Sequence, residues 1–136
     1  MTIYTSSDEL SDVFAGFMRE MATHPKLGPK FTAPKTSFRV HYTDPEAWIL
    51  IDCKQDPLEV VTNAIDRSAD VDMTMSADDG HRFWLGELKL ASAMARKKLK
   101  VTGQLPKMMS LLPAMQPAFK LFREYLIANG HADKLD

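Results

Sequence analysis

The 136-residue chain has a single cysteine, Cys53, and only six glycines. One cysteine can form no intramolecular disulfide and no cysteine cluster for a metal ion, and Cys53 is expected to be a small buried hydrophobic residue. The 17 basic and 18 acidic residues nearly balance, so no excess of positive charge indicates a nucleic-acid partner. The start of the chain lacks a charged segment followed by an apolar run, so no signal peptide is expected.

The chain also lacks any recognisable catalytic motif. It has no Gly-x-Ser-x-Gly, no glycine-rich phosphate loop and no His-Glu-x-x-His. Asp78 and Asp79 are adjacent, but their place at the start of a predicted helix explains them. His81 is expected to be an exposed helical residue. No metal-ligand spacing relates the four histidines, which are His24, His41, His81 and His131. We therefore expect neither an enzyme nor a bound cofactor.

Length predicts one domain over residues 1–136, and the helix and strand patterns together predict that it is α+β. Hydrophobic residues make up 45% of the chain and charged residues 26%, which is typical of a globular core. We expect the core to span about residues 6–129, and residues 130–136 to form a frayed polar tail. Helical periodicity follows Ser6, and a Pro- and Gly-rich connector is expected over residues 24–34. Five strands are predicted: alternation indicates those at residues 37–42, 71–76 and 99–102, an apolar run the one at 47–53, and β-branched residues the one at 58–65.

The stretch from residue 70 to residue 103 carries the clearest local pattern. Residues 71–76 alternate apolar and polar side chains, as in a strand with one apolar face. Ser76 can then cap a helix, and Gly86 suits the left-handed end of that helix. A second short helix follows, and a further strand closes at Gly103. The stretch is therefore predicted to place aromatic and methionine side chains over a sheet.

This stretch resembles the sterol carrier protein 2 family. The family pattern combines such a strand, an acidic-started helix ending in glycine, and a Gly-Lys-Leu-Lys-Val-x-Gly segment. The matching residues are Asp72 to Ser76, Asp79, Phe83, Gly86, Ala93 and Lys98-Leu99-Lys100-Val101-Thr102-Gly103. Lys97 departs from the pattern where the family usually has glycine, and Leu90 departs where proline is common. Order, spacing and length agree over nearly the whole chain.

The resemblance implies a five-stranded, largely antiparallel sheet with helices packed on one face and an apolar tunnel between. It implies non-catalytic intracellular binding and transfer of a lipid: a fatty acid, fatty acyl-CoA, phospholipid or sterol-like molecule. Two alternatives stay open. One is a lipid-holding accessory subunit of a lipid or isoprenoid-quinone biosynthetic complex, and the other is an interaction or dimerisation module with a vestigial cavity. Because the chain ends without Ser-Lys-Leu, we expect a cytoplasmic, bacterial member.

Six of the nine methionines follow residue 72 and are interleaved with aromatic residues. By residue chemistry alone such a stripe favours core packing, whereas the resemblance makes it the wall of a lipid cavity. The candidate ligand-binding residues are Met73, Met75, Phe83, Trp84, Met94, Leu99, Val101, Met108, Met109, Leu112, Met115 and Phe119. The helices after Gly103 are interrupted by proline, which fits either a gate or ordinary helix starts.

A run of basic residues follows the candidate helices. It favours a solvated face, and a transient contact with an anionic membrane surface is the alternative. The run comprises Lys89, Arg96, Lys97, Lys98, Lys100 and Lys107. The segment around Trp48 is apolar on both faces, which fits a central strand in a monomer and the interface of a homodimer equally well.

Overall fold

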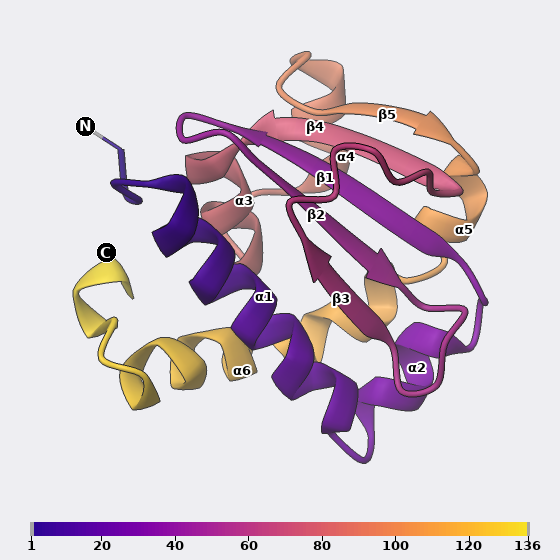
Figure 1. Cartoon of the computed structure of the whole chain (residues 1–136), viewed down its shortest axis with the longest axis horizontal. Helices are drawn as coiled ribbons and strands as arrows, with labels where there is room; N and C mark the ends of the chain where they lie inside the picture. Colours follow the sequence, from indigo (N-terminus) through magenta and orange to yellow (C-terminus); the bar gives the residue numbers. More distant parts are fainter. Residues whose placement is uncertain (1, 136) are drawn as a thin grey trace.

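The computed structural model describes residues 2–135, and its centre is one five-stranded sheet in the order β3-β2-β1-β4-β5 (Figure 1). The central pair, β1 and β4, is parallel, and the other three pairs are antiparallel. The predicted α+β class and largely antiparallel sheet are therefore confirmed. The strands are β1 (Ser37–Thr43), β2 (Ala47–Asp52), β3 (Glu59–Thr62), β4 (Val71–Ser76) and β5 (Lys100–Gly103).

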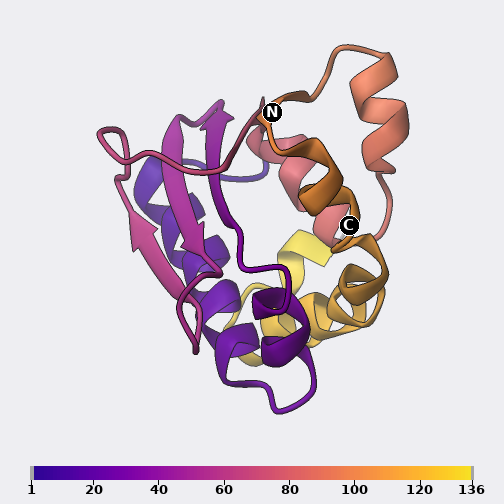
Figure 2. The same ribbon diagram turned by 90° about the vertical axis from the view of Figure 1, so that its right-hand side faces the viewer.

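Helices form a layer on one face of the sheet. They are α1 (Ser7–Thr23), α2 (Leu27–Thr32), α3 (Ala77–Trp84), α4 (Leu90–Ala95), α5 (Leu105–Met109) and α6 (Leu112–Ala128), followed by the 3-10 helix η1 (Ala132–Leu135). The long helix α1 packs over β2 and β3, α3 packs over β1 and β4, and α6 contacts α1, α2 and α3. Figure 2 shows these layers from the side. No helix in residues 2–135 is both long and apolar enough to cross a membrane.

Local signals start and stop the helices as the sequence predicts. The Ser6 hydroxyl accepts from the Glu9 amide at the start of α1, and the Ser76 hydroxyl accepts from the Asp79 amide at the start of α3. Gly86 has φ +82°, the left-handed conformation that ends the helix. Lys97, which stands where the family usually has glycine, also has a left-handed φ of +60°. The structure thus explains why glycine suits that position.

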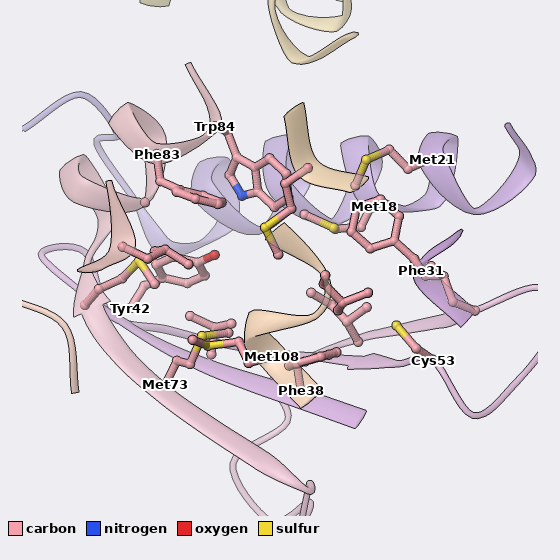
Figure 3. A pocket seen from close by; sticks show the side chains of 18 residues that line it. Met18, Met21, Phe31, Phe38, Tyr42, Cys53, Met73, Phe83, Trp84 and Met108 are labelled. Atoms are coloured by element: carbon pink, nitrogen blue, oxygen red, sulfur yellow. The ribbon is translucent and has the colours of Figure 1, made fainter. Parts of the chain in front are cut away.

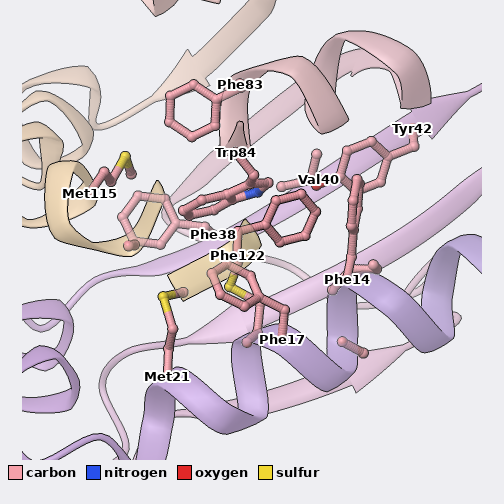
Figure 4. Close-up of a cluster of buried hydrophobic side chains, with 14 of the residues drawn as sticks. Phe14, Phe17, Met21, Phe38, Val40, Tyr42, Phe83, Trp84, Met115 and Phe122 are labelled. Carbon is pink, nitrogen blue, oxygen red and sulfur yellow. The ribbon is translucent and has the colours of Figure 1, made fainter. Parts of the chain in front are cut away.

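The buried face of the sheet follows from side-chain alternation. In β1, Phe38, Val40 and Tyr42 point toward the helices and are each less than 5% exposed. Aromatic rings join the layers above them, with centroids 5.0 Å apart for Phe14 and Tyr42 (Figure 4). Such edge-to-face and tilted contacts add to the free energy gained by burial alone.

The opposite face of the sheet carries the connection from β3 to β4. Residues 63–70 cross it, in front of β1 and β2 in Figure 1. Arg39 of β1 holds this crossover, because its guanidinium donates to the carbonyl oxygens of Ile65 at 2.8 Å and Arg67 at 2.6 Å. The same group donates to the Asp72 carboxylate at 2.8 Å. The crossover is thus tied to both strands of the parallel pair.

Two predicted irregular segments are ordered instead. The connector expected over residues 24–34 contains α2, with Pro29 in its first turn, where the missing amide costs no helical hydrogen bond. The tail expected to fray from residue 130 forms η1, and Lys134 within it is only 8% exposed. Long-range packing of the tail, which no local pattern indicates, overrides its polar composition. Asp136 lies outside the described residues.

His81 explains why that tail is ordered. Its Nδ1 lies 2.8 Å from the Tyr4 hydroxyl, and its Nε2 lies 2.6 Å from the Lys134 carbonyl oxygen. A carbonyl only accepts, so Nε2 carries the proton and Nδ1 accepts from Tyr4. His81 is 1% exposed, so the prediction of an exposed histidine is wrong. This buried clamp joins α3 to both ends of the chain.

The clamp predicts a loss of stability in mild acid. Burial lowers the pKa of His81 below its ordinary value of 6.5. The unfolded chain therefore takes up a proton that the folded chain resists, and the free energy of unfolding should fall as the pH drops below 6.5. Urea denaturation between about pH 7.5 and about pH 5.5 measures this slope. In His81→Gln the slope should flatten, and an unchanged slope would contradict the role given to His81.

Candidate functional site

A partly enclosed space of about 60 Å³ lies between the sheet and the helices, and none of the side chains around it is charged (Figure 3). It is smaller than the roughly 300–1,000 Å³ typical of small-molecule pockets. The residues that line it are Met18, Met21, Phe31, Phe38, Val40, Tyr42, Ile51, Cys53, Leu58, Met73, Met75, Gly80, Phe83, Trp84, Leu90, Met108, Leu111 and Met115. We call this space the cavity.

The floor of the cavity is made by the parallel pair of strands. Val40 of β1 lies beside Met73 of β4, and Tyr42 lies beside Met75. Paired residues of neighbouring strands point to the same face, so all four side chains meet the helices. The floor is therefore assembled from two segments that are far apart in the sequence.

The roof comes from α1 and α3, and aromatic contacts hold it. The Trp84 ring lies 5.4 Å from Phe17 and 5.0 Å from Phe83, both edge to face. Phe83 is in turn 5.5 Å from Phe119 of α6. The two rings of α3 are thus fixed by neighbours on two other helices.

A third wall closes the cavity from the side of α5 and the start of α6. Met108 of α5 is 0% exposed and Leu111 is 2% exposed, while Met115 of α6 also reaches the cavity. We call Met108, Leu111 and Met115 the plug. Helix α5 has only five residues and no side-chain cap at its start. The three side chains are therefore buried, and the amides of Met108, Leu111 and Met115 donate to carbonyl oxygens of nearby residues.

Methionine gives this lining its softness. Six of the nine methionines face the cavity, and they come from the sheet, from α1 and from the plug. Methionine has three rotatable bonds and a polarisable sulfur, so it fills irregular gaps and repacks at low cost. The cavity wall can thus change shape without breaking a hydrogen bond.

Every titratable group in the lining stays uncharged at neutral pH. Burial, with a smaller contribution from the neighbouring charge of Asp52, raises the pKa of the Cys53 thiol to about 12. Burial also raises the pKa of Tyr42 above its ordinary value. Among residues 2–135 no group of three or more histidine, cysteine, aspartate or glutamate side chains is placed to hold a metal ion. The arrangement suits an apolar molecule.

The family model of the SCP-2 sterol transfer family matches residues 18–116, which include every residue that lines the cavity. The chain belongs to the SCP-2 sterol transfer family. No curated protein sequence is similar enough to count as a match.

Solved structures with the same fold support this assignment of the SCP-2 fold. The sterol carrier protein domain 2 of Helicoverpa armigera is 19% identical, with a TM-score of 0.67 over 86% of this chain and 96% of that one. Palmitated SCP2L2 from Aedes aegypti is 17% identical, with a TM-score of 0.59 over 78% and 93%. UbiJ-SCP2, a ubiquinone synthesis protein, is 12% identical, with a TM-score of 0.59 over 80% and 94%.

The structure divides the twelve candidate ligand-binding residues of this SCP-2 chain into two groups. Those at the cavity wall are Met73, Met75, Phe83, Trp84, Met108 and Met115. The other six do not line it. Leu99 is buried in the core, and Met109 is 39% exposed on the outer side of α5. The remainder pack around the core as partly buried residues and are Met94, Val101, Leu112 and Phe119.

Sequence reasoning missed the lining from the first half of the chain. Phe38, Val40 and Tyr42 share one face of β1, but only pairing with β4 brings that face to the methionines. Met18 and Met21 lie on the apolar stripe of α1, which indicates a buried face. That stripe was the one signal available to find them, and it does not tell a cavity from a filled core.

The basic run lies outside the cavity and borders a shallow groove. Lys97, Lys98 and Lys100 line this groove at the edge of the sheet, together with Asp79 at the start of α3. All three lysines are exposed. We call them the lysine edge.

Two adjacent methionines, one buried in the plug and one exposed, allow a test of how much the plug contributes to stability. Met108→Ala should lower the free energy of unfolding by about 2–5 kcal/mol, because it removes a fully buried side chain and enlarges the cavity. Met109→Ala, on the exposed side of the same helix, should change it by less than about 0.5 kcal/mol. Urea denaturation followed by circular dichroism gives both values. Equal losses for the two variants would show that Met108 does not seal the core.

Proposed function

We propose that this chain binds a lipid in the cavity and transfers it between membranes without catalysing a reaction on it. The observation that carries the proposal is a lining without charged side chains in a member of the SCP-2 sterol transfer family. The ligand class comprises fatty acids, fatty acyl-CoA, phospholipids and sterol-like molecules. A structure of similar fold that is described as palmitated supports an acyl chain as one such ligand.

The favourable free energy of lipid binding comes from the transfer of apolar surface out of water. Each buried methylene contributes about 0.8 kcal/mol, so a long acyl chain gains several kcal/mol even after ordering costs. A space of about 60 Å³ holds only a short piece of such a chain. Binding therefore requires the wall to move.

The plug is the part of the wall that we expect to move. Helix α5 is short, lacks a side-chain cap at its start, and stands between Gly103 and the prolines of α6. Outward movement of α5 would withdraw Met108 and Leu111 and leave their volume to the ligand. The roof helix α3 is instead held by the Ser76 cap and the His81 clamp. The gate is thus proposed on the α5 side.

Native mass spectrometry of the full chain purified from cells tests the proposal. We expect a copurifying mass in the lipid range that is lost on denaturation. Val40→Phe, which fills the floor of the cavity, should reduce the lipid-bound fraction. Val61→Phe is the matched control, because Val61 lies on the opposite face of the sheet, paired with Leu50.

The other outcomes of this experiment separate the alternatives. A stable partner protein would support an accessory subunit, for which the similarity in fold to UbiJ-SCP2 is the supporting observation. An empty chain that binds no added fatty acid would support an interaction module with a vestigial cavity, for which the small volume is the supporting observation. Either result would replace the transfer proposal.

The lysine edge is the surface that we expect to contact an anionic membrane, so the rate of lipid transfer should depend on the charge of the membrane. Each cation near an anionic surface contributes about 1 kcal/mol, so Lys98→Glu with Lys100→Glu should slow transfer from anionic vesicles at least about tenfold. Transfer from neutral vesicles should stay unchanged. The control is Lys30→Glu with Lys120→Glu, a pair of exposed lysines beside another groove. Equal slowing by both pairs would exclude a specific role for the lysine edge.

A further inference from the structure

Two polar atoms stand out in the lining of the cavity, the hydroxyl oxygen of Tyr42 and the indole nitrogen of Trp84. They are the only side-chain oxygen and nitrogen among the residues that line it. Tyr42 is 4% exposed and Trp84 is 7% exposed. In Figure 3 the oxygen and the nitrogen lie on the cavity side of their rings.

Neither atom makes a hydrogen bond to another group of residues 2–135, and neither is fully buried. Among these residues the one fully buried side-chain nitrogen or oxygen without a partner is His41 Nε2, on the opposite face of the sheet. The buried hydroxyl of Tyr4 shows the usual arrangement, since it lies 2.8 Å from a ring nitrogen of His81. Burial alone accounts for the raised pKa of Tyr42, with no contribution from a hydrogen bond. Polar groups in protein interiors are nearly always paired, so two polar atoms that are accessible and unpaired are available to a ligand or a water molecule. Here both unpaired groups face the same space.

The hydrogen-bonding chemistry of the two groups defines which ligand group can pair with both. An indole N–H only donates, and a phenol O–H donates and accepts, so a group that satisfies both must carry an acceptor. No lysine, arginine or histidine lines the cavity to neutralise an anion, and burying an unpaired carboxylate is strongly unfavourable. The acceptor that fits is an uncharged oxygen, as in an ester, ketone, amide or alcohol.

Both side chains are held in place before a ligand arrives. The Tyr42 ring lies 5.0 Å from Phe14, and a Cβ added at Gly80 would come within 2.7 Å of its Cε1. Gly80 therefore provides the space in which the ring packs against α3. Trp84 is fixed by Phe17 at 5.4 Å and Phe83 at 5.0 Å. Groups fixed in advance lose little entropy on binding, so they favour specificity.

We infer that the cavity selects lipids with an uncharged oxygen acceptor that reaches Tyr42 Oη and Trp84 Nε1, over plain hydrocarbons and over ionised fatty acids. This inference rests on the proposed function, because it names the ligand of that same cavity. The apolar lining supplies the affinity, and the two polar atoms decide which part of the ligand lies beside β1 and α3.

Three probes of similar chain length test the inference: methyl dodecanoate, tetradecane and dodecanoate. Each competes with the neutral dye N-phenyl-1-naphthylamine for the full chain at neutral pH. We expect the ester to bind about three- to tenfold more tightly than the alkane, and more tightly than the carboxylate. Tyr42→Phe removes only the oxygen and should abolish most of the preference for the ester. Trp84→Phe should reduce it independently.

The control variant is Phe38→Leu, which alters the floor without touching a polar atom. This variant should lower the binding affinities for the ester and for the alkane by the same factor. Equal binding of ester and alkane by the unmodified chain, tight binding of dodecanoate, or a preference that survives in Tyr42→Phe would each overturn the inference and leave the proposed function standing. If none of the three probes displaces the dye, the proposed function fails and the inference fails with it.

Discussion

The parallel pairing of β1 with β4 is the contact on which the rest of the molecule depends. It puts Val40 beside Met73 and Tyr42 beside Met75, and it thereby creates the floor of the cavity. Arg39 secures the pair from the other face by binding both Asp72 and the crossover loop. One arginine on the face away from the cavity thus holds together the two strands that form it.

The cavity is small and six methionines line it, a combination that would suit the proposed carrier. A large empty apolar space would cost stability roughly in proportion to its volume. Under the proposed function, flexible side chains would let the wall close in the empty chain and retreat when a ligand enters. The affinity for a ligand then depends on how far its packing against the wall outweighs the packing of the plug that it displaces, so Met108 influences both stability and binding.

On the two sides of the cavity, side-chain hydrogen bonds to distant segments hold α3 but not α5. Helix α3 carries the roof residues Phe83 and Trp84, and the clamp of His81 with Tyr4 and Lys134 ties it to both ends of the chain. Figure 1 shows those ends on the same side of the molecule as α3. At α5 the Ser110 hydroxyl donates to the Lys107 carbonyl oxygen within the same short segment, and no side-chain hydrogen bond ties α5 to a distant segment among residues 2–135. Under the proposed function, the roof would orient the ligand and the plug would move to admit and release it.

The elements with local signals could be predicted from the amino-acid sequence. The Ser76 cap, the alternation of β4 and the stop at Gly86 each depend on a few neighbouring residues, and six of the twelve candidate residues do line the cavity. Three features required the folded structure: β1 completes the floor, the tail docks on His81, and Leu99 faces the core. Backbone periodicity reports which face of an element is apolar. Which faces meet, and how much space they leave between them, depends on contacts between distant segments, because packing volume is a property of the assembled layers.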